Sequence, residues 1–203
     1  MAAPTAYYVD PSINGNSGSG TSGDPYGDLQ YALDQVTRDS SNGDIFHIKA
    51  GTAESLSSGL DLTTYGSPAS TAPLQFRGYT TTAGDGGRFE IDCGGSNGLF
   101  SAINNSDIHL IDGEVHNAGS NKLLDGNSRW HLFNMELHDG TSTAELVELG
   151  GNAKVVGCYI HDTSTAGRLL EVSNDSFVYG NFFKSSRDDL VRCLSSSISV
   201  INN

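Results

Sequence analysis

A repeat of 22 to 23 residues constrains this 203-residue chain more than any other feature of its sequence. Five apolar residues align with spacings of 22, 23, 23 and 22: Leu110, Leu132, Val155, Val178 and Val200. Two further apolar sets keep the same period, and they are Val115, Leu137, Ile160 and Phe183, then Leu124, Val147 and Leu170. A period this regular predicts stacked repeats, in which each unit buries its apolar positions against the next.

The residues between the first two apolar sets predict a bend. The sets lie five positions apart, and an odd spacing would put them on opposite faces of an uninterrupted strand. Between them stand residue types that turn the chain and tolerate left-handed backbone: Asp112, Asn134, Gly157, Gly180 and Asn202. A corner there lets both sets point inward, so each repeat is predicted as three short strands and three bends. In the last repeat Arg192 aligns with Leu170, and we expect a one-residue shift that turns Val191 or Cys193 inward.

These features predict an all-β fold, a parallel β-helix. A leucine-rich repeat would need its Leu-x-x-Leu-x-Leu pattern, and helical repeats would be longer, with a period of about 3.6 residues. Only 17% of the residues are charged, against about 25% in typical proteins, so Ser, Thr, Asn and Gly supply much of the polar surface. The prediction is a single-stranded solenoid with coils of about 22–23 residues, stacked about 4.8 Å apart.

Residues 1–52 are predicted to form an N-terminal cap. Tyr7–Val9 is a strand signal, and an amphipathic helix is expected to start near Asp24 and Pro25, with one apolar stripe formed by Leu29, Ala32, Leu33 and Val36. Ile45 and Ile48 mark the next strand, which ends at Ala50-Gly51. Residues 53–203 are assigned to the coils, which stop in mid-coil, and their first strands are marked by Leu60, Leu62, Leu74, Phe76, Phe89 and Ile91.

The N-terminal segment carries a family resemblance. It reads Tyr7-Tyr8-Val9-Asp10-Pro11, Gly20-Thr21, Pro25-Tyr26, Leu29-Gln30, Ala32-Leu33, Gly43-Asp44 and Lys49-Ala50-Gly51-Thr52, and asparagine-bearing turns follow at Gly180-Asn181 and Asn202-Asn203. This pattern resembles pectate-lyase-like right-handed parallel β-helix proteins, although Asp28 stands where the family usually has Thr. The resemblance implies a right-handed helix with a short N-terminal capping helix, in a protein that faces carbohydrate or lies on a virion surface.

Charge and composition exclude several classes of partner. Eleven Lys and Arg against 24 Asp and Glu give a net charge of -13, which opposes general binding to nucleic acid or an anionic membrane. The first basic residue is Arg38, and the N-terminus lacks the features of a classical secretion signal. Cys93, Cys158 and Cys193 show no C-x-x-C spacing and are expected to be buried thiols.

His116, His138 and His161 share one ladder position, which Lys184 continues. Imidazoles about 4.8 Å apart can share a transition metal, with the residues that follow them, Asn117, Asp139 and Asp162, as outer groups. A metal site needs converging ligands, whereas ladder side chains project in parallel. The favoured interpretation is therefore a stack of exposed imidazoles without metal, and the same holds for the shorter ladder of His109 and His131.

Asp125, Glu148 and Glu171 form a predicted acidic ladder. Stacked like charges repel unless a cation bridges them, and calcium suits oxygen ligands. One carboxylate per coil falls short of the six to eight oxygens that calcium prefers. Lys122 and Arg168 lie near enough in sequence to offset the repulsion, so a ladder without calcium is favoured.

A cluster of Lys184, Arg187 and Arg192 is the candidate catalytic set. Elimination on an acidic polysaccharide needs a base and a cation that stabilises the enolate. With Phe182-Phe183 and Asp188-Asp189 the segment resembles alginate-lyase-like β-helix enzymes, but it lacks their Glu-x-Glu and Lys-Ser elements. The Asp188-Asp189 doublet is more consistent with a turn than with a hydrolase pair, because adjacent strand residues face opposite sides.

Two features predict partner surfaces. If the third apolar set faces the core, alternation turns its neighbours Leu123, Leu146 and Leu169 outward as an exposed stripe, unless the strand boundaries differ by one residue or a loop covers them. The coil opened by Val200 stops at Asn203, so either the chain is part of a longer protein or another subunit covers the open edge. Self-association or attachment to a larger assembly is therefore expected.

Three functions remain open from the sequence. The preferred one is a non-enzymatic surface protein of a larger assembly, such as a bacteriophage capsid decoration or tail component, on a virion or at an extracellular surface. The alternatives are a polysaccharide lyase or glycoside hydrolase, and a carbohydrate-binding module that uses exposed Tyr residues and Trp130.

Overall fold

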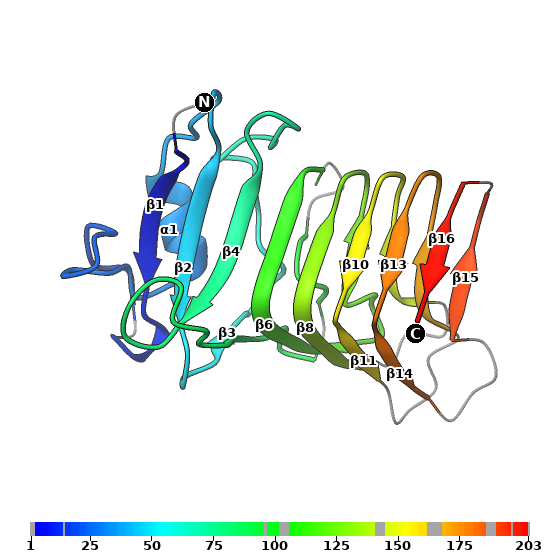
Figure 1. Ribbon diagram of the computed structural model, residues 1–203. Coiled ribbons are helices and arrows are strands. Elements are labelled where there is room, and N and C mark those ends of the chain that lie inside the picture. The colour runs from blue at the N-terminus through cyan, green and yellow to red at the C-terminus, as the bar shows by residue number, and fades with distance from the viewer. Residues whose placement is uncertain are drawn as a thin grey trace.

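The chain folds into parallel β-strands in two sheets, one of twelve strands and one of four (Figure 1). The computed structural model describes residues 3–13, 15–95, 97–101, 106–140, 145–161, 168–185, 190–195 and 197–202. The large sheet holds β1 (Thr5–Val9), β2 (Asp44–Lys49), β3 (Glu54–Ser55), β4 (Leu74–Tyr79), β5 (Phe89–Asp92), β6 (Ile108–Gly119), β8 (His131–Gly140), β10 (Lys154–Val156), β11 (Tyr159–His161), β13 (Phe177–Tyr179), β14 (Phe182–Lys184) and β16 (Ser199–Ile201). The small sheet holds β7 (Leu124–Gly126), β9 (Glu145–Leu149), β12 (Arg168–Val172) and β15 (Val191–Cys193).

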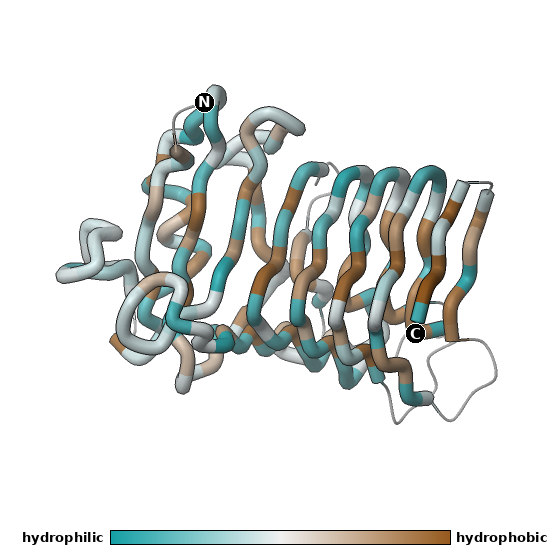
Figure 2. The backbone as a smooth tube through the Cα atoms, in the orientation of Figure 1, coloured by the Kyte–Doolittle hydropathy of each residue, from teal (hydrophilic) through white to brown (hydrophobic). Residues whose placement is uncertain are grey.

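The predicted ladders are confirmed. The first set pairs in register from Leu110 through Leu132, Val155 and Val178 to Val200. The second and third sets pair in the same way in β6, β8, β11 and β14 and in β7, β9 and β12. Their members are buried from β6 through β12, so apolar segments recur at the same level of successive strands (Figure 2).

The corner between the first two sets has the predicted backbone. Its residues all have positive φ, at 57° for Asp112, 52° for Asn134, 64° for Gly157, 63° for Gly180 and 51° for Asn202. Left-handed backbone at one position per repeat turns the chain and keeps both apolar sets on the inside.

The register shift in the last repeat is also confirmed. Leu170 pairs with Val191, so Arg192 takes the outward position beside Glu171. Val191 packs against the core, whereas Cys193 is exposed. The expectation of buried thiols therefore holds for Cys93 and Cys158 and is wrong for Cys193.

The N-terminal strand β1 pairs with β2 and thereby joins the same sheet as the repeats. The helix α1 (Leu29–Gln35) begins later than predicted, because Asp28 is its N-cap and accepts a hydrogen bond from the Tyr31 amide at 2.6 Å. The turn at Pro11–Ile13 is a 3-10 helix. No helix in the described part of the chain has the length and apolar character needed to cross a bilayer.

Two groups that were expected at the surface are buried instead. The residues predicted as an exposed stripe are fully buried: Leu123, Leu146 and Leu169. Leu146 and Val147 are both inside, so strict alternation fails here, and Leu146 lies so close to Gly140 at the end of β8 that a Cβ there would be 2.3 Å from its Cδ1. Trp130 is also fully buried, which removes it as a sugar-stacking surface.

Candidate functional site

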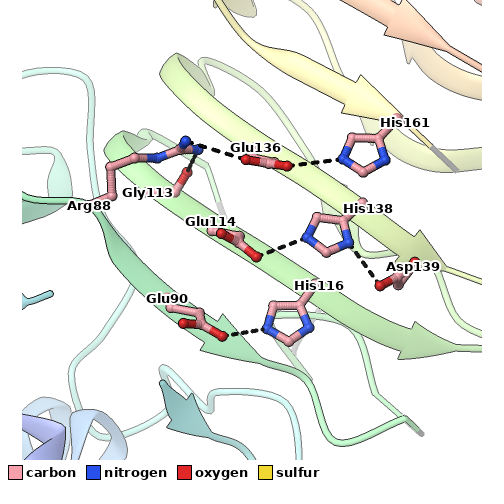
Figure 3. Close-up of polar contacts among 9 residues, drawn as sticks. All are labelled: Arg88, Glu90, Gly113, Glu114, His116, Glu136, His138, Asp139 and His161. Atoms are coloured by element: carbon pink, nitrogen blue, oxygen red, sulfur yellow. Dashed lines mark hydrogen bonds and ion pairs between the residues drawn. The ribbon is translucent and has the colours of Figure 1, made fainter. Parts of the chain in front are cut away.

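The outward face of β5, β6, β8 and β11 carries two neighbouring columns of ionisable side chains (Figure 3). One column is the predicted ladder of His116, His138 and His161, with Lys184 next in register. The other column lies two residues earlier in each strand and consists of Glu90, Glu114 and Glu136. Residues two apart in a strand point to the same side, so the two columns share one face.

The three imidazoles stack ring on ring. The His116 and His138 centroids are 5.2 Å apart with planes 6° from parallel, and those of His138 and His161 are 4.7 Å apart at 8°. Their side chains are only 14% to 19% exposed. The rings are therefore more sheltered than the exposed stack expected from the sequence.

Each histidine meets the glutamate of the preceding repeat. Nε2 lies 3.2 Å from Glu90 Oε1 for His116, 2.9 Å from Glu114 Oε1 for His138, and 3.1 Å from Glu136 Oε1 for His161. The contacts run diagonally between the two columns, as Figure 3 shows. The glutamates are not among the predicted site residues, although Glu114-x-His116 and Glu136-x-His138 recur at the repeat spacing and put both side chains on one face.

His138 has a carboxylate at each ring nitrogen. Its Nδ1 lies 2.9 Å from Asp139 Oδ2, and Asp139 itself has a φ of 56°. Burial alone would lower the pKa of His138, but the hydrogen bonds with Glu114 and Asp139 raise it above its usual value. Of the other predicted outer groups, Asn117 donates to Asp92 at 2.7 Å, and Asp162 lies outside the described residues.

Side chains of these columns converge closely enough to hold a metal ion. Ligand atoms of Glu136, His138 and His161 lie within 4.8 Å of one another, and so do those of Glu90, Glu114 and His116. The histidine rings themselves stack in parallel, as expected, and ligand atoms come this close only when the glutamates are included. The physical reason is the diagonal approach of the glutamates, which parallel projection of the histidines alone does not include.

The predicted basic cluster is divided between two sheets. Lys184 lies on β14 beside His161, whereas Arg192 lies on β15 with its Nη1 3.1 Å from Glu171 Oε2. Arg187 and the Asp188-Asp189 doublet fall outside the described residues. Lys184 and Arg192 therefore lie on different sheets, and Arg192 is paired with Glu171.

The acidic ladder pairs as predicted, with Asp125 beside Glu148 and Glu148 beside Glu171. Lys122 bonds to Glu148 and lies 3.7 Å from Asp125, and Arg192 bonds to Glu171. Burial, followed by repulsion from neighbouring carboxylates, raises the pKa of Glu171. Basic side chains thus offset part of the repulsion between these carboxylates.

The shorter histidine ladder lines a separate pocket of about 280 Å³. The His109 and His131 rings stack at 4.2 Å and 15°, and Arg129 and Lys154 join the lining. Burial first, and then the His131 ring, lower the pKa of His109 to about 4. The ring of His109 is consequently neutral near pH 7 and offers hydrogen bonds without charge.

Comparisons of the chain with protein-family models, curated proteins and solved structures gave no match.

Proposed function

We propose that the protein is a non-enzymatic structural component of a larger assembly, built as a right-handed parallel β-helix. Parallel ladders at a period of 22 to 23 residues, with left-handed corners in register, support the β-helix. The handedness follows the family resemblance of the N-terminal segment. A virion surface, as a capsid decoration or tail component, is the assembly that this resemblance favours.

An apolar stripe on the outer face of the large sheet is the observation that carries the proposal. Its members pair in register along five successive strands: Ile111, Phe133, Val156, Tyr179 and Ile201. The first three are half-buried, and the last two are 42% and 43% exposed. Five apolar side chains in a straight outward row are unusual for a surface that only meets water.

A second copy of the same chain is the proposed partner for this stripe. Two copies share one repeat spacing, so their rows can interdigitate over the whole length of the sheet. Arg77 precedes Ile111 in the row, and Lys154 stands in the neighbouring column, so two cationic side chains lie along this border. The imidazoles of that column have lowered pKa values and add no charge near pH 7. Local repulsion is therefore weaker here than the net charge of -13 suggests.

Val200 and Asn203 are the remaining residues predicted as a partner surface. Val200 is 46% exposed, and Asn203 lies outside the described residues.

Analytical ultracentrifugation over a wide concentration range tests the proposal. We expect concentration-dependent association that the Phe133→Ser/Tyr179→Ser double variant abolishes. Phe182→Ser is the matched control, because Phe182 is 62% exposed but lies outside the stripe, and it should associate like the parent. A parent chain that stays monomeric at every concentration, or equal loss in the control, would overturn the proposal.

An enzyme that acts on polysaccharides is the second candidate, favoured by the close carboxylates of the outer face. Carboxylate oxygens of Glu90 and Glu114 lie within 4.8 Å of each other, and retaining hydrolysis uses carboxyl groups about 5 Å apart. We nevertheless expect no lyase activity on pectate or alginate and no hydrolase activity on common glycans, with or without calcium. Unsaturated product that is lost in Lys184→Ala, or hydrolysis that is lost in Glu114→Gln, would establish the enzyme instead.

A further inference from the structure

Two carboxylate groups surround His138 on the outer face and favour a positive charge at its ring. Carboxylate oxygens only accept hydrogen bonds, and one lies 2.9 Å from each ring nitrogen of His138. When Nδ1 donates to Asp139, a neutral ring turns the lone pair of Nε2 toward Glu114 Oε1. Either a second ring proton or a metal cation bound at Nε2 removes this conflict.

We propose that Glu136, His138 and His161 bind one divalent transition metal ion, with Zn²⁺ as the best match. Their ligand atoms already lie within 4.8 Å of one another, and His161 Nε2 is 3.1 Å from Glu136 Oε1. Bonds of about 2.0–2.1 Å in a tetrahedral zinc site put neighbouring ligand atoms about 3.3 Å apart. The His138 and His161 rings, now 8° from parallel, have to turn out of their stack so that both Nε2 atoms face one ion.

The donor types select the metal. Two imidazole nitrogens and one carboxylate oxygen suit zinc and other late first-row ions, whereas calcium and magnesium prefer oxygen ligands alone. Glu114 Oε1, 2.9 Å from His138 Nε2, is close enough to supply a fourth ligand. The neighbouring group of Glu90, Glu114 and His116 has one imidazole and would share Glu114, so a single ion per chain is expected.

Neighbouring side chains already orient two of the ligands. Asp139 Oδ2 meets Nδ1 of His138, which directs Nε2 toward the site, as carboxylates do for zinc-bound histidines. Arg88 Nη1 lies 3.3 Å from Glu136 Oε2, and Arg88 also donates to the Gly113 carbonyl at 3.2 Å. Arg88 thus holds Oε2 of Glu136, while Oε1 of the same carboxylate faces His161 (Figure 3).

Calorimetric titration of the chelator-treated 203-residue chain with Zn²⁺ tests the site. We expect one ion per chain, with affinity at least about 10-fold weaker in Glu136→Gln and in His161→Gln, and reduced by a similar order in Asp139→Asn. His131→Gln is the matched control, because His131 belongs to the other stacked pair on the same sheet, and it should bind like the parent. Circular dichroism of each variant checks that the fold is intact.

Cobalt substitution supplies a second readout. Co²⁺ bound by imidazole in a four-coordinate site should give visible absorption bands that Glu136→Gln and His161→Gln lose. Failure of the parent to bind Zn²⁺, or equal affinity in the parent and both folded ligand variants, would overturn the proposal. The inference is independent of the association proposed above, because neither the stripe nor its double variant includes a metal ligand.

Discussion

At the scale of single residues, His109 makes the free energy of unfolding depend on pH. Its ring stacks on His131, and burial and that neighbour lower its pKa to about 4 from the ordinary value of 6.5. Between these two values the unfolded chain binds a proton that the folded chain excludes. Stability from this residue is therefore complete above about pH 6.5 and is lost as the pH falls toward 4.

The first prediction is that His109→Gln flattens the acid side of the stability profile. The parent should lose up to about 1.4 kcal/mol of unfolding free energy per pH unit more than the variant between pH 6.5 and 4. Urea unfolding of both proteins at several pH values measures this difference, and the pH 7.5 values give the baseline. Parallel profiles for the two proteins would contradict the neutral buried imidazole.

At the scale of elements, the left-handed corners decide how strands follow one another. Gly157 connects β10 to β11 with a φ of 64°, and a Cβ placed there would meet nothing within 4 Å. The equivalent corner in the preceding repeat is Asn134, which tolerates the same conformation. Backbone conformation, rather than space, therefore limits which side chains this corner accepts.

The second prediction concerns substitutions at this corner. Gly157→Ala should lower the free energy of unfolding by about 1–2 kcal/mol, because an alanine side chain disfavours left-handed backbone. Gly157→Asn should lower it less, because asparagine visits this region more readily. Chemical denaturation of both variants checks the order, and equal losses would show that the corner changes conformation when glycine is replaced.

At the scale of the whole molecule, net charge works against the compact state. The formal charge is -13, and surface ion pairs such as Lys122 with Asp125 recover little of the repulsion. Salt screens exposed charges over about 10 Å at 0.1 M ionic strength.

The third prediction is that added salt raises thermal stability. Moving from low salt to about 0.3 M NaCl should increase Tm by about 2–4 °C, the shift that corresponds to about 1 kcal/mol in a chain of this size. KCl should give the same increase, since the effect is screening. A decrease in Tm would show that salt weakens the attraction within the ion pairs more than it weakens the repulsion between the excess carboxylates.

The outward columns show what the repeat period leaves open. The period places His116, His138 and His161 in one column, and alternation places Glu114 and Glu136 on the same face. The repeat period does not specify the direction in which each histidine side chain leans. In the structure each histidine leans toward the glutamate of the preceding repeat rather than toward the glutamate of its own strand. Ligand convergence is a property of that diagonal geometry and so was absent from the sequence prediction.

The sequence by itself determined the parallel ladders, their period and one corner in each repeat, because side-chain alternation and left-handed tolerance are local properties of the chain. Only the tertiary structure decided that Leu123, Leu146 and Leu169 are buried, because other segments pack on the outer side of these strands, as Gly140 does on Leu146. Alternation places the apolar stripe from Ile111 to Ile201 on the outer face, and only the tertiary structure decided that its last two members are 42% and 43% exposed. Burial on a bent sheet depends on which strand covers which face, and no spacing of residues along the chain specifies that.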